Sequence, residues 1–147
     1  MEISRKNYSG IPMQKGTHPQ AVRVGNLLFL SGALARDTDA EFGDMEQQTD
    51  AILHRIKHIV EKEGGSLGNV VKITNFVTDN SPEATAATQR ARVKHFGDSL
   101  PASTRVRVAG LSGAPFTDRN RRHRSAGRLG GLSGPCRRQS QSTFHTQ

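Results

Sequence analysis

Three histidines have the residue type and spacing that raise the question of a metal site: His54, His58 and His95. His54 and His58 are four residues apart, so on a helix both imidazoles would lie on one face, as in helical zinc motifs. A zinc site also needs further histidine, cysteine or carboxylate ligands at a suitable spacing. We find no acid or cysteine spaced in that way. The sequence therefore favours a solvated helix face and predicts no metal site.

Two other segments could bind an anion or move a proton. Ser31 and Gly32 follow an apolar run, and backbone N–H groups at such a strand end can bind an anion. A strand that merely ends in a small-residue turn explains the pair equally well. His18 lies in the polar loop 16–20, where an imidazole could donate a hydrogen bond or transfer a proton, or could simply be solvated.

The residues around these positions predict strands and helices that alternate along the chain. Gly25-Asn26 separates two β-prone runs, as in a tight hairpin. Apolar residues recur at helical spacing between Met45 and Glu63, and Ser81-Pro82-Glu83 combines a side-chain cap, a fixed φ and a carboxylate at a helix start. The expected order is strands over 20–25 and 26–32, a short strand near Phe42, a helix over 45–63, a strand over 69–78, a helix over 82–96 and a strand over 101–110.

This order indicates an α+β fold in which a mixed sheet carries two helices on one face. A chain of 147 residues suits one domain, and the second face of so small a sheet needs cover. Association of several copies is the usual way for a short chain to supply that cover, so we expect an oligomer.

Charge is unevenly distributed along the chain. There are 21 Lys and Arg against 13 Asp and Glu, a net charge of +8, and residues 117–147 alone hold seven basic side chains and one acidic. Residues 1–116 are expected to form the domain, and residues 117–147 a basic, low-complexity, disordered tail. Cys136 is the single cysteine, which excludes an intrachain disulfide framework. Neither a membrane helix of about 20 apolar residues nor a secretion signal is visible, which favours the cytoplasm.

Several stretches carry a family resemblance when they are taken together. They are Gln20-Ala-Val-Arg-Val-Gly-Asn-Leu-Leu-Phe-Leu-Ser-Gly32, Glu46-Gln-Gln-Thr49, Val70-Val-Lys-Ile-Thr-Asn-Phe-Val-Thr-Asp79 and Pro101-Ala-Ser-Thr-Arg-Val-Arg-Val108. In order and spacing, from Gly16 to Gly113, the chain resembles the reactive-intermediate deaminase family, the RidA/YjgF group that also carries the name L-PSP endoribonuclease.

That resemblance implies a chorismate-mutase-like α+β subunit and a homotrimer whose sheets line a central barrel. It also implies small-molecule clefts between subunits. In the family such clefts bind short carboxylate-bearing imines or enamines and hydrolyse them to a keto acid and ammonia, with no metal and no organic cofactor.

The resemblance assigns site residues, with departures from the family pattern. Ser31 and Gly32 match the family's Ser-Gly, the first as a catalytic and the second as a substrate-binding candidate. His18 stands where the family often has Tyr and is the second catalytic candidate. Ser103 falls on the position of the family's carboxylate-binding Arg, and Arg105 follows two residues later on the same strand face. Either Arg105 compensates and both residues contact substrate, or Arg105 simply belongs to the polar face.

The family's final strand, which carries its water-positioning Glu, has no counterpart in Thr117–Arg124. Dropping one base from suitable codons for these residues gives Pro-Ile-Glu-Ile-Glu-Gly-Ile, a strand of the expected kind. The sequence therefore predicts that the final strand is lost, through a frameshift between about Gly113 and Thr117.

Three functions are compatible with these residues. The first is an imine or enamine deaminase, impaired by the departures above. The second is a family member that binds a small ligand without hydrolysing it. The third is an endoribonuclease or RNA-binding protein acting through its basic tail, although residues 1–116 are nearly neutral and the chain has no Trp.

Overall fold

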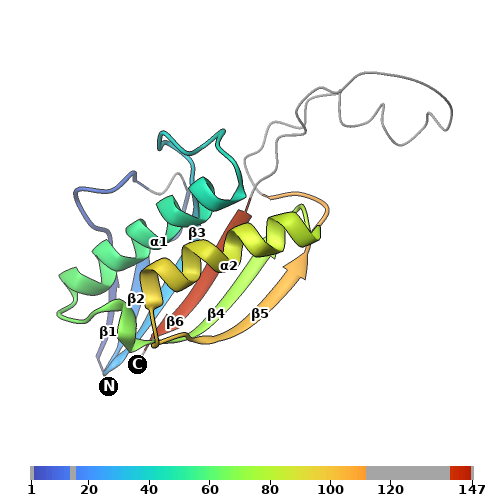
Figure 1. Ribbon diagram of the computed structural model, residues 1–147. Helices are drawn as coiled ribbons and strands as arrows, with labels where there is room; N and C mark the ends of the chain where they lie inside the picture. The colour runs from blue at the N-terminus through green and yellow to red at the C-terminus, as the bar shows by residue number, and fades with distance from the viewer. Residues whose placement is uncertain (1, 14–15, 112–139, 147) are drawn as a thin grey trace, which may run out of the picture.

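The computed structural model describes residues 2–13, 16–111 and 140–146, and shows a six-stranded mixed sheet with two helices on one face (Figure 1). The strand order is β1-β2-β3-β6-β4-β5; β4 and β5 run parallel and the other neighbours run antiparallel. The expected α+β fold is therefore confirmed. The elements are β1 (Ile3–Lys6), β2 (Ala21–Val24), β3 (Leu27–Leu34), α1 (Met45–Lys62), the short 3-10 helix η1 (Leu67–Asn69), β4 (Val70–Val77), α2 (Pro82–Phe96), β5 (Ala102–Arg107) and β6 (Ser140–Thr146).

The local signals in the sequence explain the boundaries of the hairpin and of both helices. Gly25 has a φ of 56° in the β2–β3 turn, a backbone conformation that glycine adopts without strain. Asp44 begins α1 with a capping box to Gln47, and Ser81 caps α2 through the backbone N–H of Ala84.

The core lies between the sheet and the helices. Its most deeply buried side chains are Ile52, Leu53, Ile56, Ile73 and Val77, from α1 and β4. The buried side of α2 consists largely of alanines, so this helix packs closely against α1. The expected strand near Phe42 is wrong, because hydrogen bonds between Glu41 and Thr38 and between Gly43 and Ala40 close consecutive turns there.

The C-terminal strand corrects the expectation for the tail. β6 lies between β3 and β4 and pairs antiparallel with both, so the final strand of the sheet is not lost (Figure 1). It consists of Ser140–Thr146, which come later in the sequence than Thr117–Arg124. The proposed domain boundary at residue 116, the frameshift interval and Thr117–Arg124 lie outside the described residues.

A buried carboxylate ties the first strands to the end of α1. Glu63, whose side chain is 8% exposed, accepts from Lys6 Nζ at 2.9 Å and from Arg23 Nη1 at 3.0 Å. The hydroxyl of Tyr8 donates to the same carboxylate at 2.9 Å. Burial alone would raise the pKa of Glu63, but the hydrogen bonds from Lys6, Arg23 and Tyr8 outweigh it and hold that pKa below its usual value.

This network predicts a loss of stability in acid. A carboxyl whose folded-state pKa is depressed stabilises the fold above its ordinary pKa of about 4.3, and the contribution disappears as the pH falls through the lower folded-state value. Glu63→Gln should reduce the free energy of unfolding at pH 7 by about 1–2 kcal/mol, and the difference from the parent should shrink towards pH 3. Urea unfolding at a series of pH values measures this.

The matched control is Glu61→Gln, because Glu61 is half exposed and its ion pair with Lys57 is 3.9 Å long. It should leave both stability and its pH dependence unchanged. Parallel pH curves for Glu63→Gln and the parent would contradict the assignment.

Candidate functional site

The first group of candidate residues forms where the loop 16–20 meets β3. The backbone N–H of Ser31 donates to the carbonyl of Gln20 at 3.0 Å, and its hydroxyl donates to the carbonyl of Pro19 at 2.6 Å. Gln20 is buried and anchors the loop from the other side, through Tyr8 and Pro12. His18, which precedes Pro19, is exposed and belongs to the loop that this contact joins to Ser31.

Ser31 and Gly32 lie at an irregularity inside β3, not at its end. Leu30 pairs with Phe144 and Ala33 pairs with Ser142, so two residues of β3 oppose one residue of β6. This is the pattern of a β-bulge, a device that re-aims backbone and side chains next to binding sites. The alternative of a strand ending in a small-residue turn is therefore wrong, since β3 continues to Leu34.

The second group lies on β5, which is an edge strand of the sheet and is separated from β3 by β6 and β4. Ser103 and Arg105 pair in register with Ile73 and Asn75 of β4, so both face the helix side. The Arg105 guanidinium donates to Asn80 Oδ1 at 2.8 Å, to Thr88 Oγ1 at 3.0 Å and to the carbonyl of Asp79 at 3.2 Å. These contacts hold Arg105 against the start of α2.

Sequence reasoning missed Arg92, which joins this second group from α2. Its Nη1 donates to Ser103 Oγ at 3.0 Å, and its buried Nε has no hydrogen-bond partner among the described residues. Burial lowers the pKa of Arg92 and of Arg105; for Arg105 the nearby Asp79 carboxylate acts against this lowering, and the Arg92 cation adds to it. A guanidinium therefore does stand at Ser103, where the family pattern places one, but a helix supplies it.

The two groups are apart within one chain. β6 and β4 lie between β3 and β5, and three strand spacings amount to about 14 Å. The structure thus places Ser31 and Gly32 beside the loop that carries His18, and Ser103 and Arg105 on one face of β5, but does not bring these two groups together.

The sheet face turned away from the helices carries exposed apolar side chains. Leu27 is 38% exposed, Phe29 37% and Val106 38%. Strand register puts Phe76 on this face as well, since it pairs with Val106. The helices cover only the other face (Figure 1).

The histidines are not arranged as their spacing suggested. His58 Nε2 lies 2.8 Å from the carbonyl of Ser9, whereas His54 turns towards Asp50 and His95. Asp50 precedes His54 by four residues and is the acid that the sequence analysis overlooked.

No helix in the described part of the chain is long and apolar enough to cross a membrane.

Comparison with known proteins adds a family match. The family model Endoribonuclease L-PSP matches residues 11–116. A RutC family protein of Pyrococcus abyssi is 34% identical over 103 residues, which cover 68% of this chain and 80% of that protein. The 2-iminobutanoate/2-iminopropanoate deaminase of Salmonella typhimurium is 35% identical over 103 residues, with 68% and 80% covered.

Solved structures share the fold. RidA from a Psychrobacter species aligns with a TM-score of 0.68 at 26% identity, covering 92% of this chain and 91% of that one. Yeast Mmf1 aligns with a TM-score of 0.73 at 19% identity, covering 99% and 98%, a likeness that shows the fold alone.

Proposed function

The chain belongs to the Endoribonuclease L-PSP family, the RidA/YjgF group, and on that premise we propose that it is an enamine/imine deaminase that needs no cofactor. Its substrates are short imines that carry a carboxylate, and its products are a keto acid and ammonia. Two family relatives that bear the name 2-iminobutanoate/2-iminopropanoate deaminase, at 35% and 34% identity, support this choice.

The observation that carries the proposal is the pair of guanidinium groups around Ser103. Arg92 and Arg105 donate their hydrogen bonds to uncharged oxygens of Ser103, Asn80, Thr88 and the Asp79 backbone. Two partly buried cations that lie close together repel each other, and a bound anion would offset this repulsion. A guanidinium binds a carboxylate through two parallel hydrogen bonds, a geometry that Lys lacks. The position of β5 at the sheet edge makes this locus accessible to a ligand.

The reaction itself needs a positioned water. Its oxygen attacks the imine carbon while the C=N π bond breaks, and the resulting carbinolamine expels ammonia to form the C=O bond. His18 is the candidate for holding and deprotonating this water. Ser31, at the bulge in β3, binds the loop that carries His18. The Ser31 hydroxyl donates a hydrogen bond to the backbone carbonyl of Pro19, so Ser31 is a positioning residue in this scheme.

A homotrimer completes the site in this proposal. The two groups lie about 14 Å apart within one chain, so a site that uses both must take them from neighbouring subunits. Association through the open face would also bury Leu27, Phe29 and Val106. The cytoplasmic setting expected from the sequence remains a prediction.

A binding protein without hydrolysis is the second candidate, and one observation favours it. All three nitrogens of Arg105 already bond to groups of the chain itself, so a carboxylate must compete for them. Such a protein would bind keto acids or imines without turning them over.

The test is imine hydrolysis, with the imine generated by an amino-acid oxidase and trapped competitively by semicarbazide. Addition of the chain should reduce semicarbazone formation from a carboxylate-bearing imine. It should not affect an imine without a carboxylate, generated by an amine oxidase. Sedimentation analysis of the same sample should show a trimer.

Unchanged trapping by a folded trimer would reject the deaminase and leave the binding protein. Cleavage of RNA by the same preparation would instead favour the endoribonuclease.

A further inference from the structure

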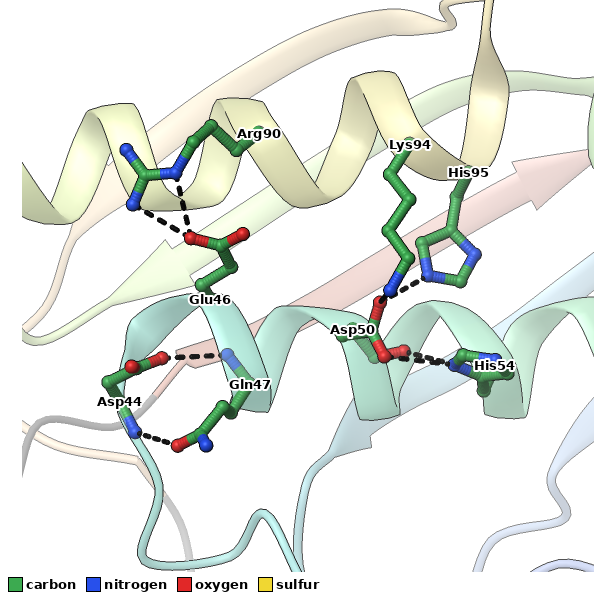
Figure 2. A network of polar contacts seen from close by, with 8 residues as sticks. All are labelled: Asp44, Glu46, Gln47, Asp50, His54, Arg90, Lys94 and His95. Atoms are coloured by element: carbon green, nitrogen blue, oxygen red, sulfur yellow. Dashed lines mark hydrogen bonds and ion pairs between the residues drawn. The ribbon is translucent and has the colours of Figure 1, made fainter.

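We propose that Asp50, His54 and His95 form a binding site for a Zn²⁺-class divalent cation between α1 and α2. Asp50 Oδ1 lies 2.8 Å from His95 Nε2, and Asp50 Oδ2 lies 3.3 Å from His54 Nδ1 (Figure 2). One ligand atom from each residue falls within a set whose members are all within 4.8 Å of one another. The site lies in the helix layer and is independent of the proposed deaminase chemistry.

The spacing is close to what a tetrahedral cation requires. Zn²⁺ bonds to imidazole nitrogen and carboxylate oxygen at about 2.0–2.1 Å, which places ligand atoms about 3.3 Å apart. The separations of 2.8 Å from Asp50 Oδ1 to His95 Nε2 and 3.3 Å from Asp50 Oδ2 to His54 Nδ1 lie near this value. They involve the two different oxygens of Asp50, and the full set of ligand atoms lies within 4.8 Å, so the side chains must close in around an ion. His54 has an exposed side chain, so its ring can move to complete the set.

The neighbouring ion pair between Glu46 and Arg90 bridges α1 and α2 without any histidine. Glu46 of α1 is bound by Arg90 of α2 at 2.7 Å, and one turn further Lys94 binds Asp50 at 2.9 Å in the same way (Figure 2). Each acid therefore already has its cation. His54 and His95 are additional ligands that converge on one carboxylate and not on the other.

The burial of the three residues also fits a coordination site. The side chain of His95 is 7% exposed, that of Asp50 28% and that of His54 62%. The rings of His54 and His95 meet edge to face, with centroids 4.7 Å apart. One ligand is thus held rigidly, and the side near His54 stays open to an entering ion and to water.

A groove provides the entry path. Asp50 and His54 line a cavity of about 620 Å³ together with His58, Arg55 and the loops around Pro12 and Asp39. Water in this groove would fill the coordination positions that the protein leaves open. Imidazole and carboxylate ligands select Zn²⁺, Co²⁺, Ni²⁺ and Cu²⁺ over Mg²⁺.

Binding of the metal ion requires that the groups now bonded to its ligand atoms leave them. His54 Nδ1 contacts the carbonyl of Asp50 at 3.0 Å as well as its carboxylate, so a proton on that nitrogen must leave to solvent before it can ligate a metal. Lys94, which is 67% exposed, must also withdraw from Asp50 Oδ1. His95 Nε2, which lies 2.8 Å from Asp50 Oδ1, must likewise give up a proton, so the cation replaces a lysine ammonium and one proton from each imidazole.

The experiment is isothermal titration of the full chain with Zn²⁺, repeated with Co²⁺ to read tetrahedral coordination from its visible absorption. His54→Ala and His95→Gln should each raise the dissociation constant for Zn²⁺ at least tenfold. Glu46→Gln is the matched control, because Glu46 forms the neighbouring α1–α2 ion pair with Arg90 and is not one of the three proposed ligands, and it should stay within twofold of the parent.

A gain-of-binding variant separates lost binding from lost folding. Lys94→Met removes the competing ammonium from an exposed position and should tighten Zn²⁺ binding several-fold. Zn²⁺ binding that is absent from the parent, that is unchanged in both His variants, or that weakens equally in Glu46→Gln would overturn the proposal.

Discussion

A chain that ends at residue 139 is expected to lose cooperative folding. β6 pairs with β3 from Leu28 to Leu34 and with β4 from Val70 to Val77, so its removal divides the sheet into β1-β2-β3 and β4-β5. Two inner strands would expose unpaired backbone groups, which cannot be satisfied under the helices. The loss should exceed the whole stability of a domain, about 5–15 kcal/mol.

Urea unfolding followed by far-UV circular dichroism measures this effect. The truncated chain should show no sigmoidal transition and should aggregate through its new edges. The matched control is a chain that begins at residue 7 and lacks β1, an edge strand that pairs with β2 alone. It should still unfold cooperatively, at a lower midpoint. A truncated chain whose midpoint equals that of the parent would show that β6 does not hold the sheet together.

The reading frame adds a second comparison. A chain restored to the frame that gives Pro-Ile-Glu-Ile-Glu-Gly-Ile after Gly113 supplies an apolar final strand directly. It should be more stable than the chain as it stands, because its alternating Ile residues favour a half-buried strand, whereas the sequence of β6 is mostly polar. Equal stabilities would speak against the frameshift.

Replacement of Arg105 by Lys is expected to reduce kcat/KM for a carboxylate-bearing imine about 10- to 150-fold, since hydrogen bonds to charged groups contribute about 1.5–3 kcal/mol. The variant keeps the charge but loses the planar donor pair. Arg92→Lys should have an effect of similar size, because Arg92 reaches the same locus through Ser103. Both reductions should appear mainly in KM.

Arg107→Lys is the control on the same strand. Arg107 shares the face of Arg105 but is exposed and lies two residues further from Ser103. It should retain the parent's kinetics. If all three variants behave alike, or if Arg105→Lys and Arg92→Lys stay fully active, the carboxylate locus lies elsewhere. Circular dichroism of each variant checks that the fold persists.

Most of the architecture follows from local signals in the sequence. The hairpin at Gly25-Asn26, the capping residues Asp44 and Ser81 and the alternation in β5 act over a few residues, so each element can be predicted without its neighbours. β1 escaped detection because Arg5 and Lys6 make an edge strand look like a polar lead. β6 escaped because the composition of the preceding tail hid a short run with Thr143 and Phe144.

The candidate sites were harder to predict because they depend on packing between elements. Arg92 becomes relevant only when α2 lies against β5, and no spacing in the sequence links it to Ser103. Asp50 and His54 are four residues apart and were visible, but His95 joins them only through the contact of α1 with α2. The bulge at Ser31-Gly32 likewise requires the partner strand β6.

The central place of β6 has a consequence for biosynthesis. Leu28 pairs with Thr146, so the middle of the sheet closes only when a strand more than a hundred residues further along the chain joins β3. During synthesis β3 and β4 are therefore made well before the strand that must lie between them. We expect the sheet to form late in synthesis, and the nascent chain to be most prone to aggregation before β6 is made.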